Sequence, residues 1–285
     1  MTTAQNTTTQ ERYSRLEKHA RDIRKAIVDM VHTAQSGHCG GSLSATDIVA
    51  ALYFDIMHID PAQAAMADRD RFVLSKGHAC PVWYAALALR GYFPVAELST
   101  LRKNASRLQG HPVATYLPGI DATAGSLGMG FGQAVGMALN AKLRKESWKV
   151  YTLLGDGELN EGLVWEAAAS SAKFGLDNLI AIVDRNNLQN DGTADAIMPM
   201  EPIDKKFEAF NWRVIKINGH DMSQVVAALE ETSNSRGKPL CIIASTVKGK
   251  GVSFMENKRE WHGKPPSDDE HAQAIREICG GEKCS

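Results

Sequence analysis

The chain has 285 residues, 44% of them hydrophobic, and a formal net charge of −1. This composition is typical of a globular protein large enough to bury a core, and the near-neutral charge argues against nucleic acid as the main partner, because phosphate binding requires an excess of basic residues. No stretch approaches ~20 uninterrupted apolar residues, so we expect neither a membrane span nor a membrane partner.

The chain begins with a polar stretch, MTTAQNTTTQ, which lacks the apolar core of a secretory signal. We therefore expect residues 1–11 to form a flexible tail and residues 12–285 to form a single domain. The five cysteines are irregularly spaced and include no CxxC pair, so neither a disulfide framework nor a zinc site is indicated. A reducing cytoplasm is the expected location.

Strand-length apolar runs alternate with helical segments along the rest of the chain. The predicted strands are Arg71–Ser75, Val150–Gly155, Leu179–Asp184, Trp212–Ile217 and Leu240–Thr246. The predicted helices are Leu43–Met57 after the N-cap Ser42, Pro81–Arg90, Phe131–Lys145, Leu159–Phe174, and Met222–Glu231 after Asp221. This alternation predicts an α/β fold with a parallel sheet flanked by helices on both faces. The polar, glycine-rich stretch 249–266 is expected to be a functional loop.

Two of the predicted strands end in polar residues. Gly155-Asp156-Gly157 ends one strand, and Asn186, Asn187 and Leu188 follow the next, about one βαβ unit later. Neighbouring parallel strands would bring Asp156 and Asn186 together at the carboxyl edge of the sheet, where ligands bind. Carboxylate, amide and carbonyl oxygens suit magnesium or calcium, and magnesium would leave room for a diphosphate. Either segment alone could be an ordinary turn, but the two together favour a site.

The pair of motifs resembles the thiamine diphosphate signature, which opens with GDG and closes with NN. Further stretches resemble transketolases, in the expected order and over nearly the whole chain. These stretches are Ser36-Gly37-His38, Asp68–Ala79, Pro118-Gly119-Ile120, Gly125-Ser126-Leu127-Gly128, Asn218–Asp221 and Trp261-His262-Gly263. The resemblance implies the thiamine diphosphate-binding fold, in the domain that holds the cofactor's diphosphate.

The resemblance also assigns roles by motif position. It implies that Mg²⁺, or Ca²⁺ or Mn²⁺, is bound by the Asp156 and Asn186 side chains and the Leu188 carbonyl. The residues implied to bind thiamine diphosphate are His78, Gly125, Ser126, Leu127, Gly155, Asp156, Gly157, Glu158, Asn186 and His262. Glu161 falls where the family has a glutamate at the subunit interface, linked to cofactor activation.

Four histidines, His38, His78, His111 and His262, match active-site histidines of transketolases. Each lies beside glycine or proline in a loop, and for any one of them a surface or packing role is the ordinary alternative. Histidine suits sugar chemistry because it can move a hydroxyl proton near neutral pH. The implied reaction transfers a two-carbon ketol unit from a ketose to an aldose phosphate, as in pentose phosphate metabolism, with the cofactor as the electron sink.

The sequence ends at Ser285, whereas a whole transketolase carries two further domains. We therefore expect the N-terminal subunit of a split enzyme, active with a C-terminal subunit in an α2β2 heterotetramer. Cys39 and Met129 replace the proline and glutamine of many relatives, which leaves the sugar substrate open. Lys248-Gly249-Lys250-Gly251 resembles the corresponding loop of split relatives, and a solvated turn is the ordinary alternative for its lysines. The alternatives are a transketolase for a modified ketose donor and a non-catalytic, cofactor-binding scaffold subunit.

Overall fold

The structure is a computed structural model that describes residues 3–234 and 237–280. Its centre is a parallel sheet of five strands in the order β1-β2-β3-β5-β4. The strands are β1 (Arg71–Leu74), β2 (Val150–Gly155), β3 (Leu179–Arg185), β4 (Arg213–Asn218) and β5 (Leu240–Ser245). Every predicted strand is confirmed, with small shifts at the ends, and β2 and β3 are hydrogen-bonded neighbours as expected.

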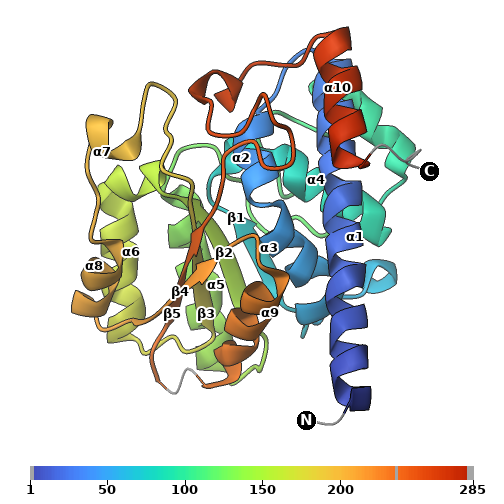
Figure 1. Ribbon diagram of the computed structural model, residues 1–285. Coiled ribbons are helices and arrows are strands. Elements are labelled where there is room, and N and C mark those ends of the chain that lie inside the picture. Colours follow the sequence, from blue (N-terminus) through green and yellow to red (C-terminus); the bar gives the residue numbers. More distant parts are fainter. Residues whose placement is uncertain (1–2, 235–236, 281–285) are drawn as a thin grey trace.

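Helices cover both faces of the sheet, which confirms the predicted fold class (Figure 1). One apolar core contains residues of α1 (Thr3–Ala34), α2 (Cys39–Ser44), α3 (Thr46–Ala51), α4 (Cys80–Arg90), α9 (Met222–Glu230) and α10 (Asp268–Ile278). The other contains residues of α5 (Met129–Arg144), α6 (Gly162–Lys173) and α8 (Ile203–Ala209). Strand side chains alternate between the two cores; Leu153, for example, lies in the first and Leu154 in the second.

Short helical segments complete the fold. They are α7 (Ala194–Ile197), the π-helical turn η1 (Leu52–Ile56), and the 3₁₀ turns η2 (Pro61–Gln63), η3 (Gly77–Ala79), η4 (Val95–Thr100), η5 (Gly157–Asn160), η6 (Glu231–Asn234) and η7 (Arg259–His262). The stretch 249–266, expected to be a loop, contains only η7. Asp221 caps α9 as predicted, and its side chain accepts hydrogen bonds from the backbone N–H groups of Ser223 and Gln224.

Two expectations differ from the structure at the N-terminal side. Residues 3–11 were expected to lie in a tail, but they continue α1, whose apolar face is buried from Leu16 onward. The helix predicted to start after Ser42 starts at Cys39, and the Ser42 hydroxyl donates to the His38 carbonyl at 2.6 Å. The hydroxyl satisfies a carbonyl one turn back, so it does not cap the helix.

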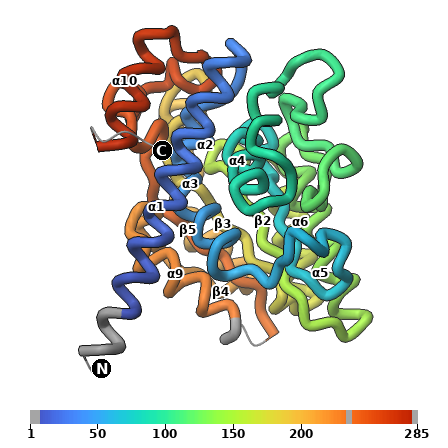
Figure 2. Tube along the Cα trace, turned by 90° about the vertical axis from the view of Figure 1, so that its right-hand side faces the viewer, coloured from blue at the N-terminus to red at the C-terminus, as the bar shows by residue number. Residues whose placement is uncertain are grey.

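The first and last helices lie side by side, because α10 packs along α1 (Figures 1 and 2). Cys39, Cys80 and Cys241 are buried free thiols, whereas Cys279 is disulfide-bonded, which the cysteine spacing did not predict. Within the described ranges, none of the helices has both the length and the apolar character needed to cross a membrane.

Candidate active site

A cavity of about 270 Å³ lies at the carboxyl edge of the sheet, beyond the ends of β1, β2, β3 and β5. Nine of the ten residues predicted to bind the cofactor line it: His78, Gly125, Leu127, Gly155, Asp156, Gly157, Glu158, Asn186 and His262. Ser126 is exposed and does not line it. Leu188 also lines the cavity, together with residues that the sequence analysis did not assign: Gly41, Lys76, Gln189, Asn190, Asp191 and Lys248.

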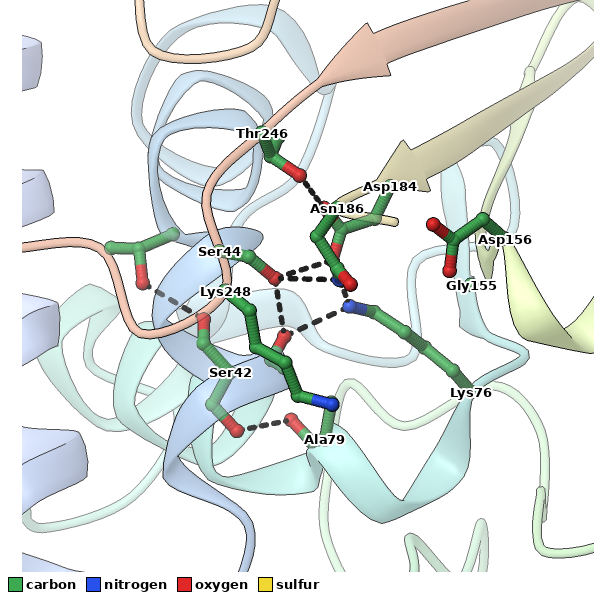
Figure 3. Close-up of polar contacts among 12 residues, drawn as sticks. Ser42, Ser44, Lys76, Ala79, Gly155, Asp156, Asp184, Asn186, Thr246 and Lys248 are labelled. Atoms are coloured by element: carbon green, nitrogen blue, oxygen red, sulfur yellow. Dashed lines mark hydrogen bonds and ion pairs between the residues drawn. The ribbon is translucent and has the colours of Figure 1, made fainter. Parts of the chain in front are cut away.

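Asp156 and Asn186 come together as predicted, because they follow adjacent parallel strands. The Asp156 side chain points toward Asn186 (Figure 3), and one carboxylate oxygen accepts from the Gly157 N–H at 2.8 Å. The other oxygen accepts from the Asn187 N–H at 2.5 Å. Asn187 presents this N–H from a left-handed conformation, with φ of 59°, which asparagine tolerates. Burial, and then the charge of Asp184, raise the pKa of Asp156.

The Leu188 carbonyl, the third predicted metal ligand, accepts a hydrogen bond from the Lys248 ammonium at 3.0 Å. Lys248 also donates to the Gln189 carbonyl at 3.2 Å, and its nitrogen lies 2.8 Å from Nδ1 of His262. Lys248 is only 1% exposed, so the ordinary alternative of a solvated turn does not hold for this lysine. Burial, and then the charge of Lys76, lower the pKa of Lys248 to about 8.

Lys76 forms the floor of the cavity through a buried ion pair with Asp184 (Figure 3). Lys76 also donates to the Gly41 carbonyl at 2.8 Å. Asp184 accepts from the hydroxyls of Ser44, at 2.5 Å, and Thr246. Burial alone would raise the pKa of Asp184. The charge of Lys76 and the hydrogen bonds to the carboxylate outweigh burial, so the pKa is lowered. The pair is therefore ionised and internally neutral, and it joins the ends of β1, β3 and β5.

Glu158 lines the cavity, and its carboxylate also connects the segments of the cavity wall. Its carboxylate is 2% exposed and accepts from the Ser75 hydroxyl and from the backbone N–H groups of Gly128, at 2.8 Å, and Gly155, at 3.0 Å. These contacts tie the end of β2 to the start of α5. Burial raises the pKa of Glu158. The hydrogen bonds of Glu158 therefore hold the cavity wall together, and its predicted contact with the cofactor stays a prediction.

Three of the four predicted histidines form a cluster, in which His78 and His262 line the cavity and His38 contacts both. The ring centroids of His38, His78 and His262 lie 5.1 to 5.3 Å apart. Burial is the main cause that lowers their pKa values, to about 4 for His38, about 2 for His78 and about 3 for His262. Neighbouring cations add to this effect, so the three rings are neutral near pH 7.

The remaining predicted site residues lie outside the cavity wall. His38 packs behind His78 and His262 and does not line the cavity. His111 is exposed, and its pKa is lowered by partial burial and by Arg102. Glu161 is exposed at the N-terminus of α6, which leaves it accessible to a partner.

The donor set fits a divalent cation with a bound diphosphate. Asp156 is buried with only N–H donors around its carboxylate, and an adjacent cation would relieve the cost of its burial. Asn186 and Leu188 add two oxygens, which is the ligand chemistry of magnesium. Lys248 has no carboxylate within 4.0 Å in the described part of the chain, so its charge is available to an anion. Gly155 and Gly157 both line the cavity, and a Cβ added at Gly157 would lie 2.9 Å from Cγ of Gln189, so a side chain there would crowd the cavity wall.

Known proteins of one family resemble this chain over most of its length. Residues 16–283 match the family described as transketolase, thiamine diphosphate binding domain. The chain is 44% identical over 263 residues to the 6-deoxy-6-sulfo-D-fructose transketolase subunit SqwG of a Clostridium species, covering 92% of this chain and 96% of that protein. It is 43% identical over 267 residues to one of the subunits of apulose-4-phosphate transketolase from Actinobacillus succinogenes, covering 93% of this chain and 96% of that protein. Among solved structures, transketolase from Leishmania mexicana superposes with a TM-score of 0.88 and 32% identity, over 92% of this chain and 41% of that enzyme.

Proposed function

The chain belongs to the transketolase family, through its thiamine diphosphate-binding domain, and we propose that it is the cofactor-binding subunit of a split transketolase. The observation that carries this proposal is the cavity in which Asp156, Asn186, Leu188 and Lys248 converge. The matches over nearly the full length of two transketolase subunits support the division into subunits. A scaffold subunit would not need oxygen donors, a buried amine and neutral histidines around one cavity.

Each group at the cavity has a distinct task in this proposal. Asp156, Asn186 and Leu188 would hold Mg²⁺, while Lys248 and the backbone at Gly157 would hold the diphosphate. When bound, thiamine diphosphate supplies a carbon nucleophile and an electron sink for breaking the bond beside a ketose carbonyl. The neutral rings of His78 and His262 can then donate hydrogen bonds to sugar oxygens or accept them without adding charge to the site.

The donor is proposed to be a ketose with an anionic terminal group, and the acceptor an aldose phosphate. The two relatives are named for a sulfonated and a phosphorylated ketose, which favours a modified donor over an ordinary pentose phosphate. Cys39 does not line the cavity and is fully buried, so it does not contact the sugar directly. Specificity for the terminal group would come mainly from the partner subunit.

The partner subunit is proposed to cover the face at the start of α5, in an α2β2 assembly. Met129 is 49% exposed there, and a side chain at Gly136 would meet open space. Glu161 is exposed at the start of α6, and α6 packs against α5. A docked partner would bury the apolar Met129 side chain and reach Glu161. The cytoplasmic location suggested by the cysteine usage stays a prediction.

Cofactor binding can be tested on the full chain with inorganic diphosphate as the probe. Calorimetry should show diphosphate binding that requires Mg²⁺ and is lost in Asp156→Ala. Lys248→Met should weaken binding by roughly tenfold to a hundredfold, the range for one hydrogen bond to a charged group. Lys250→Met is the matched control, because Lys250 lies in the same turn but pairs with Glu256 at 3.4 Å. Equal binding by both lysine variants would reject the assignment.

Catalysis can be tested by adding the product of the neighbouring reading frame. The chain alone should show no ketol transfer, and the co-purified complex should transfer two carbons from a phosphorylated or sulfonated ketose to an aldose phosphate. Turnover by the chain alone would refute the split site. Tight Mg²⁺-diphosphate binding with no turnover for any ketose tested would favour the scaffold alternative.

A further inference from the structure

Arg102, two residues after the end of η4, joins the two loops that carry His38 and His111. Its guanidinium donates to the Ser36 hydroxyl at 3.0 Å, two residues before His38. It also donates to the Gly110 carbonyl at 3.5 Å, one residue before His111. The Arg102 backbone has φ of 57°, a left-handed conformation that is uncommon for arginine. The side chain therefore lies between the loops at the expense of a strained backbone.

The same guanidinium contacts the ring of His38. Its Nη2 lies 3.4 Å from His38 Nδ1. A guanidinium donates hydrogen bonds but cannot accept them, so Nδ1 must offer its lone pair. In a neutral imidazole the proton then lies on the other nitrogen, Nε2. The Nε2 atom of His38 faces Gly263, the residue that follows His262. A Cβ added at Gly263 would lie 3.6 Å from this nitrogen.

A second cation has the same relation to a second histidine. The Lys248 nitrogen lies 2.8 Å from Nδ1 of His262, so a charged Lys248 also directs the proton of His262 to Nε2. Two rings of the cluster are thus each oriented by a cation. Because the sequence analysis assigned neither Arg102 nor Lys248 to the site, this arrangement is visible only in the structure.

We propose that Arg102 is a positioning residue for ketol transfer: it holds His38 in the neutral tautomer with its proton on Nε2 and fixes the His38 loop against the His111 loop. The role in transfer rests on the proposed function. His38 then presents an N–H donor at Nε2, so from this nitrogen it can stabilise a sugar oxygen but cannot remove a proton. The charged and titratable groups that face His38 are Arg102, His111, His78, His262 and Lys248.

The tautomer can be measured directly on the full chain. Long-range proton–nitrogen NMR of histidine-labelled protein distinguishes the two ring nitrogens, and His38→Gln identifies the His38 signals by their loss. The unmodified chain should show Nε2–H for His38. Arg102→Met should give a mixture of His38 tautomers and move the His38 titration midpoint upward from about 4. Arg102→Lys keeps the positive charge, so it should retain most of the Nε2–H tautomer and a midpoint close to that of the unmodified chain. Lys103→Met, an exposed neighbouring position, should change neither.

The outcomes separate this inference from the proposed function. A proton on Nδ1 of His38 in the unmodified chain would overturn the inference, even if Arg102→Met failed to fold. An unchanged tautomer and midpoint in folded Arg102→Met would overturn it as well. If the tautomer behaves as expected but the complex with its partner shows no ketol transfer, the proposed function fails while the positioning of His38 by Arg102 stands.

Discussion

Breaking the ion pair between Lys76 and Asp184 should destabilise the chain far more than breaking an exposed pair. The two side chains are 3% and 0% exposed, so Lys76→Met would leave a carboxylate buried without a counter-charge. Loss of one partner of a buried pair costs about 3–5 kcal/mol. The hydroxyls of Ser44 and Thr246 still donate to Asp184, which places the expected cost near the lower limit, about 3 kcal/mol.

Urea unfolding of the full chain measures this cost. With a slope of about 3 kcal/mol per molar urea, the midpoint should fall by about 1 M. The control is Lys205→Met, which breaks a pair with Glu208 whose side chains are 66% and 45% exposed and should cost at most about 1 kcal/mol. The double variant Lys76→Met/Asp184→Asn also removes the unpaired buried carboxylate, so it should recover part of the stability lost in Lys76→Met. Equal midpoints for Lys76→Met and Lys205→Met would refute the reasoning.

The pH dependence provides a second check with a definite sign. The pKa of Asp184 is below its ordinary 3.8 in the folded chain. The contribution of Asp184 to the stability of the fold is therefore fully present above pH 3.8 and is lost as the pH falls through the pKa of Asp184 in the folded chain. In Lys76→Met, burial without a cation raises this pKa, and protonation relieves the buried charge. The stability difference between the two proteins should therefore narrow as the solution is acidified from pH 7.

Two further predictions concern stability at the site. The pKa of His78 is about 2 in the folded chain against an ordinary 6.5, so the unfolded chain takes up a proton at higher pH and stability should fall as the pH decreases below 6.5. Urea unfolding of His78→Asn should show this slope reduced by up to about 1.4 kcal/mol per pH unit. Gly77→Ala would place a Cβ 2.2 Å from the Ala124 carbonyl oxygen, so thermal unfolding should show a loss of several kcal/mol of stability. The control is Gly136→Ala, in open space on α5, which should stabilise the chain by up to about 1 kcal/mol.

The sheet and its ligand-binding edge could be predicted from the sequence because their signals are local. The runs that became β2 and β3 are apolar and end at once in Asp156 and Asn186. The order of parallel strands then brings these two residues together without further information. The helices α1, α8 and α10 were not predicted, because their polar residues mask the buried positions; Arg24 in α1 is 8% exposed and pairs with Asp47 at 2.5 Å.

The rest of the site depends on contacts between distant parts of the chain. Lys76 and Asp184 are separated by 108 positions, and Lys248 and Leu188 by 60. No local pattern distinguishes a buried lysine from a solvated one in a glycine-rich turn, which is why the sequence alone does not reveal the burial of Lys248. Its neighbour Lys250 is partly exposed and pairs with Glu256, as a surface lysine would.

The different surroundings of the two buried lysines explain how one edge can be both stable and reactive. Lys76 is neutralised by Asp184, so its charge is used inside the fold and the strand ends are held together. Lys248 meets two backbone carbonyls and a histidine, which leave a full positive charge facing the cavity. An anion that binds there is strongly attracted to Lys248, because folding has already removed water from this charge without pairing it with a carboxylate. Burial, and then the same charge, lower the pKa of His262, so Lys248 contributes both to anion binding and to the neutrality of this histidine.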